Sequence, residues 1–378
     1  VNETTADAVL ARQLIFDTGL REANVGLTRR NVFASQYALG DVRQTVILNV
    51  TIDYYNLLED KNLVEVQTES VKRSQVALDV ITAQFQAKLA AQVDTLQAQA
   101  DLANARVALI QSQTAYDLAQ AALKNSMGIV SAQQITLSAA SAAQPDIAPD
   151  TRDLQTYVDT AFHNRLDVKE QQEVVNAAGY SVRIARINSG LTVNADVTEG
   201  YELNPASGQE RTFTVDFSYP LFDAGSTRAA LKASEAQLEE ARRNLDQLEQ
   251  NVHLQVEQGY DAREEARKNI VQANTAVQAA QANYDAALGK QQQGQINVLD
   301  VVTAEQQLLT AQVNQVAALF NYYIADAQLQ RSIGVNDPTY IPRVPGAKPA
   351  QAALTGDTAT VAISHTSVHS ARSRRGSR

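Results

Sequence analysis

The 378-residue sequence predicts a mainly α-helical protein with a small β part, arranged as two internal repeats. Three features support this fold class. Similar residues recur 206 positions apart, long stretches without proline carry apolar residues at every seventh position, and a short central segment alternates apolar with polar residues. A period of seven is typical of helices that pack as coiled coils, and a period of two is typical of strands with one apolar face.

The repeat is clearest at a Phe-Asp-x-Gly motif, which begins at Phe16 and again at Phe222. At the same offset and without a gap, further pairs match: Tyr54/Tyr260, Asp94/Asp300, Tyr116/Tyr322, Ser126/Ser332 and Gly128/Gly334. Heptad-rich helices can match by chance, but chance matches need gaps. We therefore predict a first repeat at 1–128 (a partial β-strand and a helix pair), a connector at 129–152, a second repeat at 153–334 (a helix, a β-hairpin and a helix pair) and a disordered tail at 335–378.

In each repeat the motif is followed by two helical runs that we expect to form a long antiparallel coiled coil. The first runs cover 20–87 and 226–288, and short breaks follow at 88–93 and 289–297. The second runs end at Gly128 and Gly334, residues that suit a helix C-terminus. A helix of about 60 residues is about 90–100 Å long, far longer than a globular domain needs.

The first long run of each repeat carries a line of residues at every seventh position, here called the seam, and the seams of the two repeats differ in composition. In the second repeat, small or apolar residues fall at every seventh position from Leu231 to Ala287. In the first repeat the seam is clear from Val25 to Val46 and is polar beyond it. The rest of that helix must therefore pack through another stripe.

Two alternating segments lie between the helices of the second repeat. One runs from Leu191 to Thr198, the other from Thr212 to Leu221, and 204–208 joins them. One face is apolar and aromatic while the other is hydroxylic and acidic, as a strand between lipid and water requires. A soluble hairpin with one face on a core is the alternative, although no other segment offers an obvious apolar layer to cover it. The stretch 5–15 is the expected counterpart of the second strand, with a weaker alternation.

These residues resemble the TolC-like outer-membrane efflux family over nearly the whole of 9–334. The resemblance is carried by Pro220-Leu221-Phe222-Asp223-Ala224-Gly225, by the segment 294–301, and by Asn164-Arg165-Leu166-Asp167 at the start of a helix that leads to the strand at Leu191. Two positions depart from the family pattern: Leu166 stands where the family usually has Pro, and Lys88 where it has Gly. By the repeat offset, the resemblance implies that the family's first helix and first strand would precede Val1, so we expect the sequence as given to supply three of the family's four strands.

The resemblance implies a homotrimer in which the long helices form an α-barrel across the periplasm and transmembrane β-hairpins lie in outer-membrane lipid. It implies passive export of small molecules or proteins, with a periplasmic adaptor (membrane fusion) protein and an inner-membrane transporter as partners. The expected location is the outer membrane, with a long periplasmic extension. A soluble coiled-coil scaffold or tether without a pore is the alternative, because it also predicts long helices.

The resemblance also indicates candidate sites. Asp94 and Asp300 are the expected aperture carboxylates, although an acid in the first turn of a helix is also favoured by the helix dipole alone. The expected adaptor contacts at the two tips, which ordinary helix–helix turns would also explain, are Lys88, Leu89, Ala90, Gln92, Gly294, Gln295 and Asn297. The expected membrane-facing residues, for which core burial is the alternative, are Tyr201, Phe213, Val215, Phe217 and Tyr219.

Composition argues against several other functions. The chain has no cysteine and therefore no disulfide and no thiolate metal site. Its net charge of −10 disfavours a nucleic-acid surface. His365 and His369 are four residues apart but have no acidic partner nearby, so we expect no metal site. No catalytic constellation is present, so the sequence predicts neither an enzyme nor a cofactor.

Overall fold

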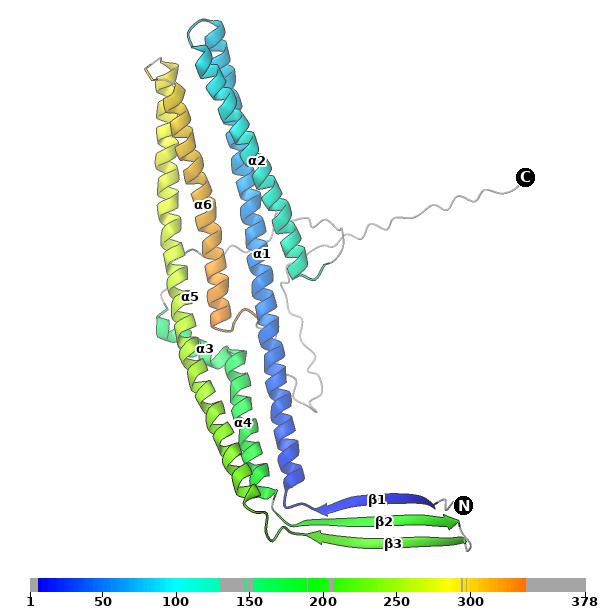
Figure 1. Cartoon of the computed structure of the whole chain (residues 1–378). Helices are drawn as coiled ribbons and strands as arrows, with labels where there is room; N and C mark the ends of the chain where they lie inside the picture. The colour runs from blue at the N-terminus through cyan, green and yellow to red at the C-terminus, as the bar shows by residue number, and fades with distance from the viewer. Residues whose placement is uncertain are drawn as a thin grey trace, which may run out of the picture.

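The computed structural model describes residues 6–129, 147, 152–188, 190–203, 207–293, 295–296 and 298–337, apart from the side chains of 6–9, 201–203 and 207–210. Most of the predicted connector and of the predicted tail therefore lies outside the described residues. The predicted fold class is confirmed, since the chain is mostly helical with a small strand part (Figure 1).

Two long helical hairpins form the body of the molecule. The first consists of α1 (Leu20–Gln86) and α2 (Gln92–Ser126), and the second of α5 (Ser226–Gln292) and α6 (Val298–Ser332). Every bound of the second hairpin lies 206 residues after the matching bound of the first. The predicted break at 289 is corrected to the residue after Gln292, because Gly289 continues the helix.

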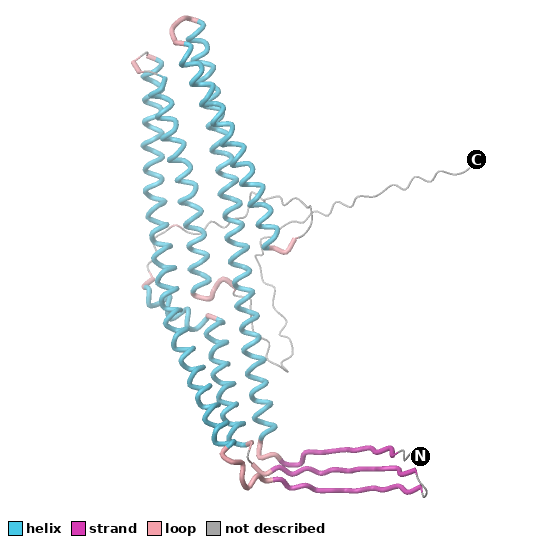
Figure 2. Tube along the Cα trace, in the orientation of Figure 1, coloured by secondary structure: helices cyan, strands magenta, loops and turns pink. Residues whose placement is uncertain are grey.

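Two shorter helices occupy the half of the molecule away from the hairpin tips. They are α3 (Leu154–Asn164) and α4 (Leu166–Ile187). In this half α4 packs against both α1 and α5, and α3 packs against α5. Figure 2 shows the helices running side by side and leading into the strands at the end opposite the tips.

A three-stranded antiparallel sheet forms that end, in the order β1 (Ala6–Phe16), β2 (Thr192–Leu203) and β3 (Ser207–Ser218). The weakly alternating first segment is thus a strand. Its alternation is weak because Leu10 and Leu14 lie on the same face as Arg12, and a register shift between Leu14 and Phe16 then interrupts its pairing with β2. The third strand was expected to reach Leu221 but ends at Ser218, because Pro220 has no N–H to donate to a neighbouring strand.

The core is small and divided. One buried cluster joins α3 to α5 and the end of α6, around Tyr157, Val252 and Leu329. A second joins α5, α6 and α1 around Phe320 and Tyr323. Among the described residues, no helix has both the length and the apolar character to cross a membrane.

The first-repeat seam is exposed in the single chain. Val25, Val32, Leu39 and Val46 retain 54, 38, 64 and 48% of their accessible surface. Their counterparts in α5 run from the half-buried Leu231 to the fully buried Val252, which lies in the cluster with α3. No described element of the same chain covers this stripe of α1.

The ends of α2 and α6 yield a test with a built-in control. Gly128 and Gly334 both have positive φ, +71° and +74°. A Cβ on Gly334 would lie 2.9 Å from the backbone nitrogen of Arg165, whereas a Cβ on Gly128 would meet nothing within 4 Å. We predict that Gly128→Ala costs about 1 kcal/mol of unfolding free energy and that Gly334→Ala costs a further 1–3 kcal/mol or so. Urea denaturation of both variants measures this, and equal losses would contradict the structure.

Candidate functional site

One face of the sheet is apolar and uncovered. In β3 the apolar side chains are Phe213, Val215 and Phe217, whose register partners in β2 are Val197, Ala195 and Val193. Phe213 and Phe217 are 69 and 71% exposed, so neither side chain is buried in a core of the single chain. Tyr219 is also exposed but lies beyond the end of the strand. The side chain of Tyr201 lies outside the described residues.

The other face of the sheet is polar. Arg12 of β1 donates two hydrogen bonds to Asp196 of β2, from Nε to Oδ1 at 2.7 Å and from Nη2 to Oδ2 at 3.0 Å. Asn194 and Asp216 are register partners on this same face. A sheet with one apolar and one ionic face is suited to separate lipid from water.

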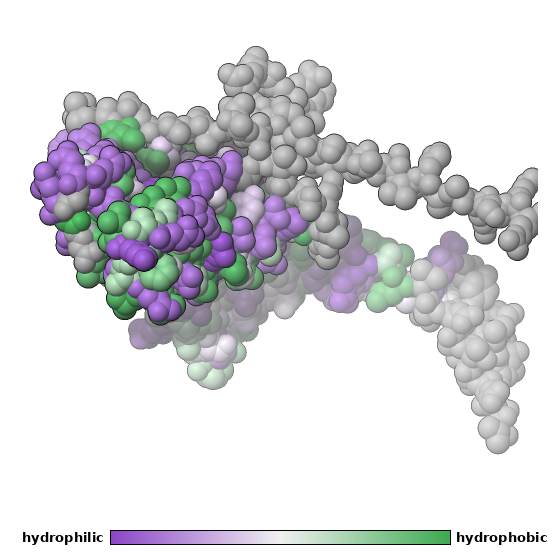
Figure 3. All heavy atoms as spheres, turned by 90° about the horizontal axis from the view of Figure 1, so that it is seen from above, coloured by the Kyte–Doolittle hydropathy of each residue, from purple (hydrophilic) through white to green (hydrophobic). Residues whose placement is uncertain are grey.

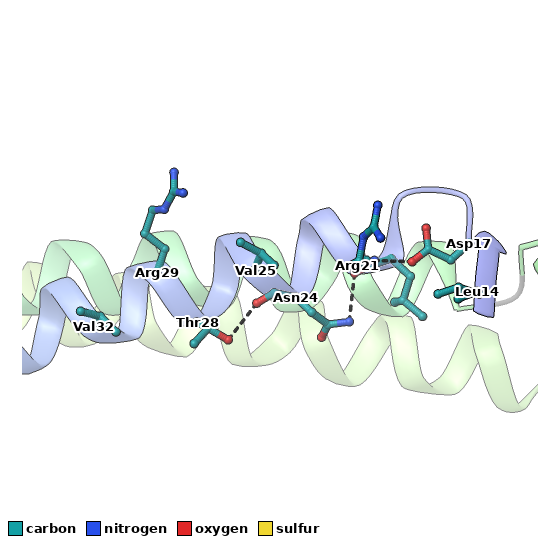
Figure 4. Close-up of a pocket in the computed structure, with 9 residues that line it drawn as sticks. Leu14, Asp17, Arg21, Asn24, Val25, Thr28, Arg29 and Val32 are labelled. Carbon is teal, nitrogen blue, oxygen red and sulfur yellow. Dashed lines mark hydrogen bonds between the residues drawn. The ribbon is translucent and has the colours of Figure 1, made fainter. Parts of the chain in front are cut away.

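An aspartate begins each long helix where the strands end. Asp17 accepts hydrogen bonds from the N–H groups of Gly19 and Arg21, at 3.1 and 2.7 Å, and Figure 4 shows the second of these. Asp223 accepts the equivalent bonds in the second repeat. The pKa of Asp223 is lowered by its hydrogen bonds from the Thr227 side chain and from the Thr227 and Gly225 amides. The Phe-Asp-x-Gly motif is therefore a helix-capping device.

The first tip is stabilised by its own backbone and by Asp94. Lys88 has φ of +60°, the left-handed conformation that glycine adopts most easily. Asp94 accepts a hydrogen bond from the Ala91 N–H at 3.0 Å, as in a capping box. Lys88, Leu89 and Gln92 are exposed, Leu89 by 81%. Ala90 is half-buried.

The second tip repeats a backbone hydrogen bond of the first. The Gln295 N–H donates to the Lys290 carbonyl at 2.9 Å, as the Leu89 N–H donates to the Gln84 carbonyl at 2.8 Å. Ile296 packs against the buried cluster that contains Ala287 and Val301. Asp300 is exposed in the first turn of α6. Gly294 and Asn297 lie outside the described residues. Asp94 and Asp300 thus lie at the tips of different hairpins, at the same end of the molecule (Figure 1). Viewed from above, polar and apolar residues are intermixed on the molecular surface (Figure 3).

Arg165 joins four segments near the middle of the molecule. Its guanidinium is buried and donates to both Asp167 oxygens, to Gln255 Oε1 of α5 at 2.8 Å and to the Ser332 carbonyl of α6 at 3.0 Å. Burial raises the pKa of Asp167, but the hydrogen bonds and charge of Arg165 outweigh this effect, and the pKa is lowered. Leu166, which replaces the family's Pro, is the first residue of α4.

Polar contacts also connect the two hairpins where α1 meets α6. Arg331 donates to Asp41 at 2.7 Å, and Gln44 donates to the Gly334 carbonyl at 3.2 Å. Nearer the tips, Arg73 of α1 lies 3.5 Å from Glu305 of α6. Burial raises the pKa of Glu305, and Arg73 opposes that shift. These contacts fix the relative positions of the two hairpins.

The described residues contain no group of three or more His, Cys, Asp or Glu side chains placed to hold a metal ion. The polar contacts described above join helices, cap helices or join strands of the sheet. The arrangement therefore offers structural ion pairs, an amphipathic sheet and two exposed tips.

Comparison with known proteins decides the family. The family model described as outer membrane efflux protein matches residues 3–129 and 157–335. The chain belongs to this family. It is an outer-membrane efflux protein of the TolC-like type, and its long helices form the periplasmic extension.

Individual relatives agree with this assignment. The chain is 26% identical over 337 residues to the outer membrane efflux protein BepC of Brucella suis, covering 85% of this chain and 70% of BepC. It is 24% identical to the protein CyaE of Bordetella pertussis, covering 74% of this chain and 57% of CyaE. The crystal structure of the outer membrane protein VceC of Vibrio cholerae has the same fold, with a TM-score of 0.71 at 18% identity, covering 88% of this chain and 87% of VceC.

Sequence reasoning missed the ion pairs inside the efflux protein. Besides Arg73–Glu305, these include Arg263 of α5, whose Nε lies 2.7 Å from Asp326 of α6. Single charges on a heptad pattern do not reveal which of them face another helix. The Arg165-x-Asp167 spacing was the one usable signal, because two residues of opposite charge at a helix start can pair with each other.

Asp94 gives a local prediction for the first tip. Asp94→Ala removes the acceptor for the Ala91 N–H, which we expect to cost about 1 kcal/mol of local stability. Amide hydrogen exchange at residues 91–97 should become about fivefold faster, while the matched variant Gln92→Ala should leave it unchanged. Unchanged exchange in Asp94→Ala would show that the cap contributes nothing.

Asp167 gives a prediction on pH. Because its pKa is lowered in the folded protein, its ionised form stabilises the fold above the unfolded pKa of about 4, and this contribution is lost as pH falls through the lower folded pKa. The stability difference between the natural protein and Asp167→Asn should therefore be largest near pH 6 and should shrink below about pH 4. Thermal melting across that range measures it, and a difference independent of pH would rule out the ionic contribution.

Proposed function

We propose that three copies of this chain form a passive export duct that crosses the outer membrane through its strands and the periplasm through its helices. The observation that carries this proposal is the uncovered aromatic face of the sheet. Exposed Phe213 and Phe217 would be unfavourable in water but favourable in lipid. The ionic face with Arg12 and Asp196 then lines the interior of the duct.

The sheet and the helices both require further copies. The described sheet has three strands, with β1 and β3 at its edges, and open edges in lipid would leave backbone N–H and C=O groups without partners. The exposed stripe from Val25 to Val46 likewise calls for an apolar neighbour. Neighbouring subunits satisfy both requirements at once.

The tips are the proposed contact with a periplasmic adaptor protein, and an inner-membrane transporter would supply the energy. The exposed tip residues Lys88, Leu89, Gln92 and Gln295 lie farthest from the sheet, where such a partner could reach them. The cargo would be small molecules or proteins, and the chain itself would have no enzymatic role.

Asp94 and Asp300 are the proposed aperture carboxylates. Each lies in the first turn of the helix that returns from its tip, so each hairpin contributes one carboxylate at the same end of the molecule. Six carboxylates around one constriction would favour cations.

Membrane extraction tests the channel against the soluble scaffold. The protein should stay in the outer-membrane fraction in high salt and be released by detergent, because apolar contacts are insensitive to salt screening. Phe213→Ser combined with Phe217→Ser should reduce membrane retention, while Thr212→Ser on the opposite face should not. A natural chain that remains soluble without detergent would support the scaffold instead.

Planar-bilayer conductance tests the aperture. Asp300→Asn removes three of the six proposed carboxylates and should lower the cation-to-anion permeability ratio roughly twofold. The matched control is Asp246→Asn, an exposed acid in the half of α5 nearer the sheet. Unchanged selectivity in Asp300→Asn would remove this residue from the aperture.

A further inference from the structure

We propose that a band of exposed arginine and lysine side chains at the sheet end of the helices binds the anionic phospholipid headgroups of the periplasmic leaflet of the outer membrane. This inference rests on the proposed function, because it requires the sheet to lie in lipid. It adds an interaction that depends on lipid charge and that fixes how deep the chain lies in the membrane.

The first argument is the position of six cations. They belong to α1, α4 and α5, three helices that each begin or end at the sheet (Figure 1). The six residues, here called the basic band, are all exposed: Arg21, Arg29, Arg183, Arg186, Arg228 and Lys232.

The band lies at the height of the headgroups when the sheet crosses the membrane. Arg29 is the member farthest from the sheet, at about 14 Å along α1 from its first residue, Leu20. The headgroup layer of a bilayer is about 5–8 Å deep, and the long side chain of an arginine extends toward it. Arg21, Arg186 and Arg228 lie within two residues of the helix ends, so they reach this layer directly.

The second argument is the local charge balance, which is opposite to that of the chain. Segments 17–30, 180–188 and 223–232 together hold seven Lys and Arg residues but three Asp and Glu residues, whereas the whole chain has 32 and 42. Two of these acids, Asp17 and Asp223, accept the capping hydrogen bonds of α1 and α5. The third, Glu22, lies 3.8 Å from Arg21. The sheet end of the helices is therefore positively charged in a chain with a net charge of −10.

The third argument is that most of the band has no counter-charge within the chain. Among the described residues, no acidic side chain forms an ion pair with five of its members: Arg29, Arg183, Arg186, Arg228 and Lys232. Farther along α5, by contrast, Arg243 pairs with Glu239 at 2.6 Å. Figure 4 shows Arg21 and Arg29 on the same side of α1, one helical turn on either side of Val25. Like charges held together repel one another, so a surface dense in anions stabilises the band.

The fourth argument distinguishes a membrane from a soluble anion. Leu221 and Phe222, between β3 and α5, are 91 and 87% exposed. At the equivalent passage of the first repeat, the Arg183 Nη2 would lie 4.0 Å from a Cβ placed on Gly19, so this guanidinium reaches the sheet end of α1. Exposed apolar and aromatic side chains beside arginines are typical of a lipid–water boundary, where rings lie at headgroup level. A guanidinium there can donate two parallel hydrogen bonds to one phosphate.

Lipid selectivity in reconstituted vesicles tests the band. The protein is placed in phosphatidylcholine vesicles that contain a trace of spin-labelled phosphatidylglycerol or spin-labelled phosphatidylcholine. The fraction of each label that is immobilised at the protein gives its relative affinity for the two headgroups. We expect a several-fold preference for phosphatidylglycerol, which high salt should reduce because it screens the charges.

Three variants show whether the preference comes from the charge of the band. The test variant, Arg183→Gln with Arg186→Gln, Arg228→Gln and Lys232→Gln, should lose most of the preference. The charge-matched control removes four exposed cations of α5 outside the band, Arg242→Gln, Arg243→Gln, Lys268→Gln and Lys290→Gln, and should keep the preference. Arg183→Lys with Arg186→Lys and Arg228→Lys retains the charge and should also keep most of it. An unchanged preference in the test variant, or an equal loss in all three, would overturn the proposal.

Flotation of the same vesicles separates this inference from the proposed function. If the natural protein does not float with phosphatidylcholine vesicles, the sheet does not enter lipid and the proposed function fails. If it floats but prefers neither headgroup, the band alone is wrong. A test variant with an altered anion permeability in planar bilayers and an unchanged lipid preference would place these cations inside the duct, which also overturns the inference.

Discussion

The structure depends on one constraint: a helix of 67 residues, about 100 Å long, cannot be covered by a single partner half its length. Each long helix therefore contacts one short helix near the tips and another near the sheet. α5 meets this need with α6, α4 and α3, whereas α1 has α2 and α6 near the tips and α4 on one side near the sheet. The apolar stripe from Val25 to Val46 is the part of α1 left without cover. Most of the chain's architecture follows from completing this coverage.

Polar contacts decide how the covered helices are aligned. Apolar heptads allow neighbouring helices to slide by one repeat at little cost, because leucine and alanine positions recur every seven residues. Arg165 prevents such a slide, since its guanidinium bonds Asp167, Gln255 and the Ser332 carbonyl at once. Gly334 belongs to the same arrangement, because only a residue without a side chain fits against the Arg165 backbone. The ion pairs add specificity to a body whose stability comes from apolar packing.

The sequence predicted the elements well because they depend on local patterns. The repeat offset located both hairpins, and the capping aspartates Asp17 and Asp223 marked the beginnings of α1 and α5 to the residue. What it could not supply was the identity of neighbours. Whether Val46 or Val252 is covered depends on α3 and α4, not on the residues beside them, and the two positions look alike in sequence. For the same reason the pairing of Arg263 with Asp326 was invisible. The proposed adaptor contacts and aperture carboxylates remain predictions.

The two repeats differ in sequence at the tips of their hairpins. At the tips, Lys88 adopts a left-handed conformation in the first repeat, and the matching position in the second is Gly294. A lysine there costs about 1–2 kcal/mol relative to glycine and places a positive charge at the end of the molecule. Asp94 bonds the Ala91 N–H in the same tip. The two hairpins thus share one helical framework, and the exchange of Lys88 for Gly294 gives their tips a different charge.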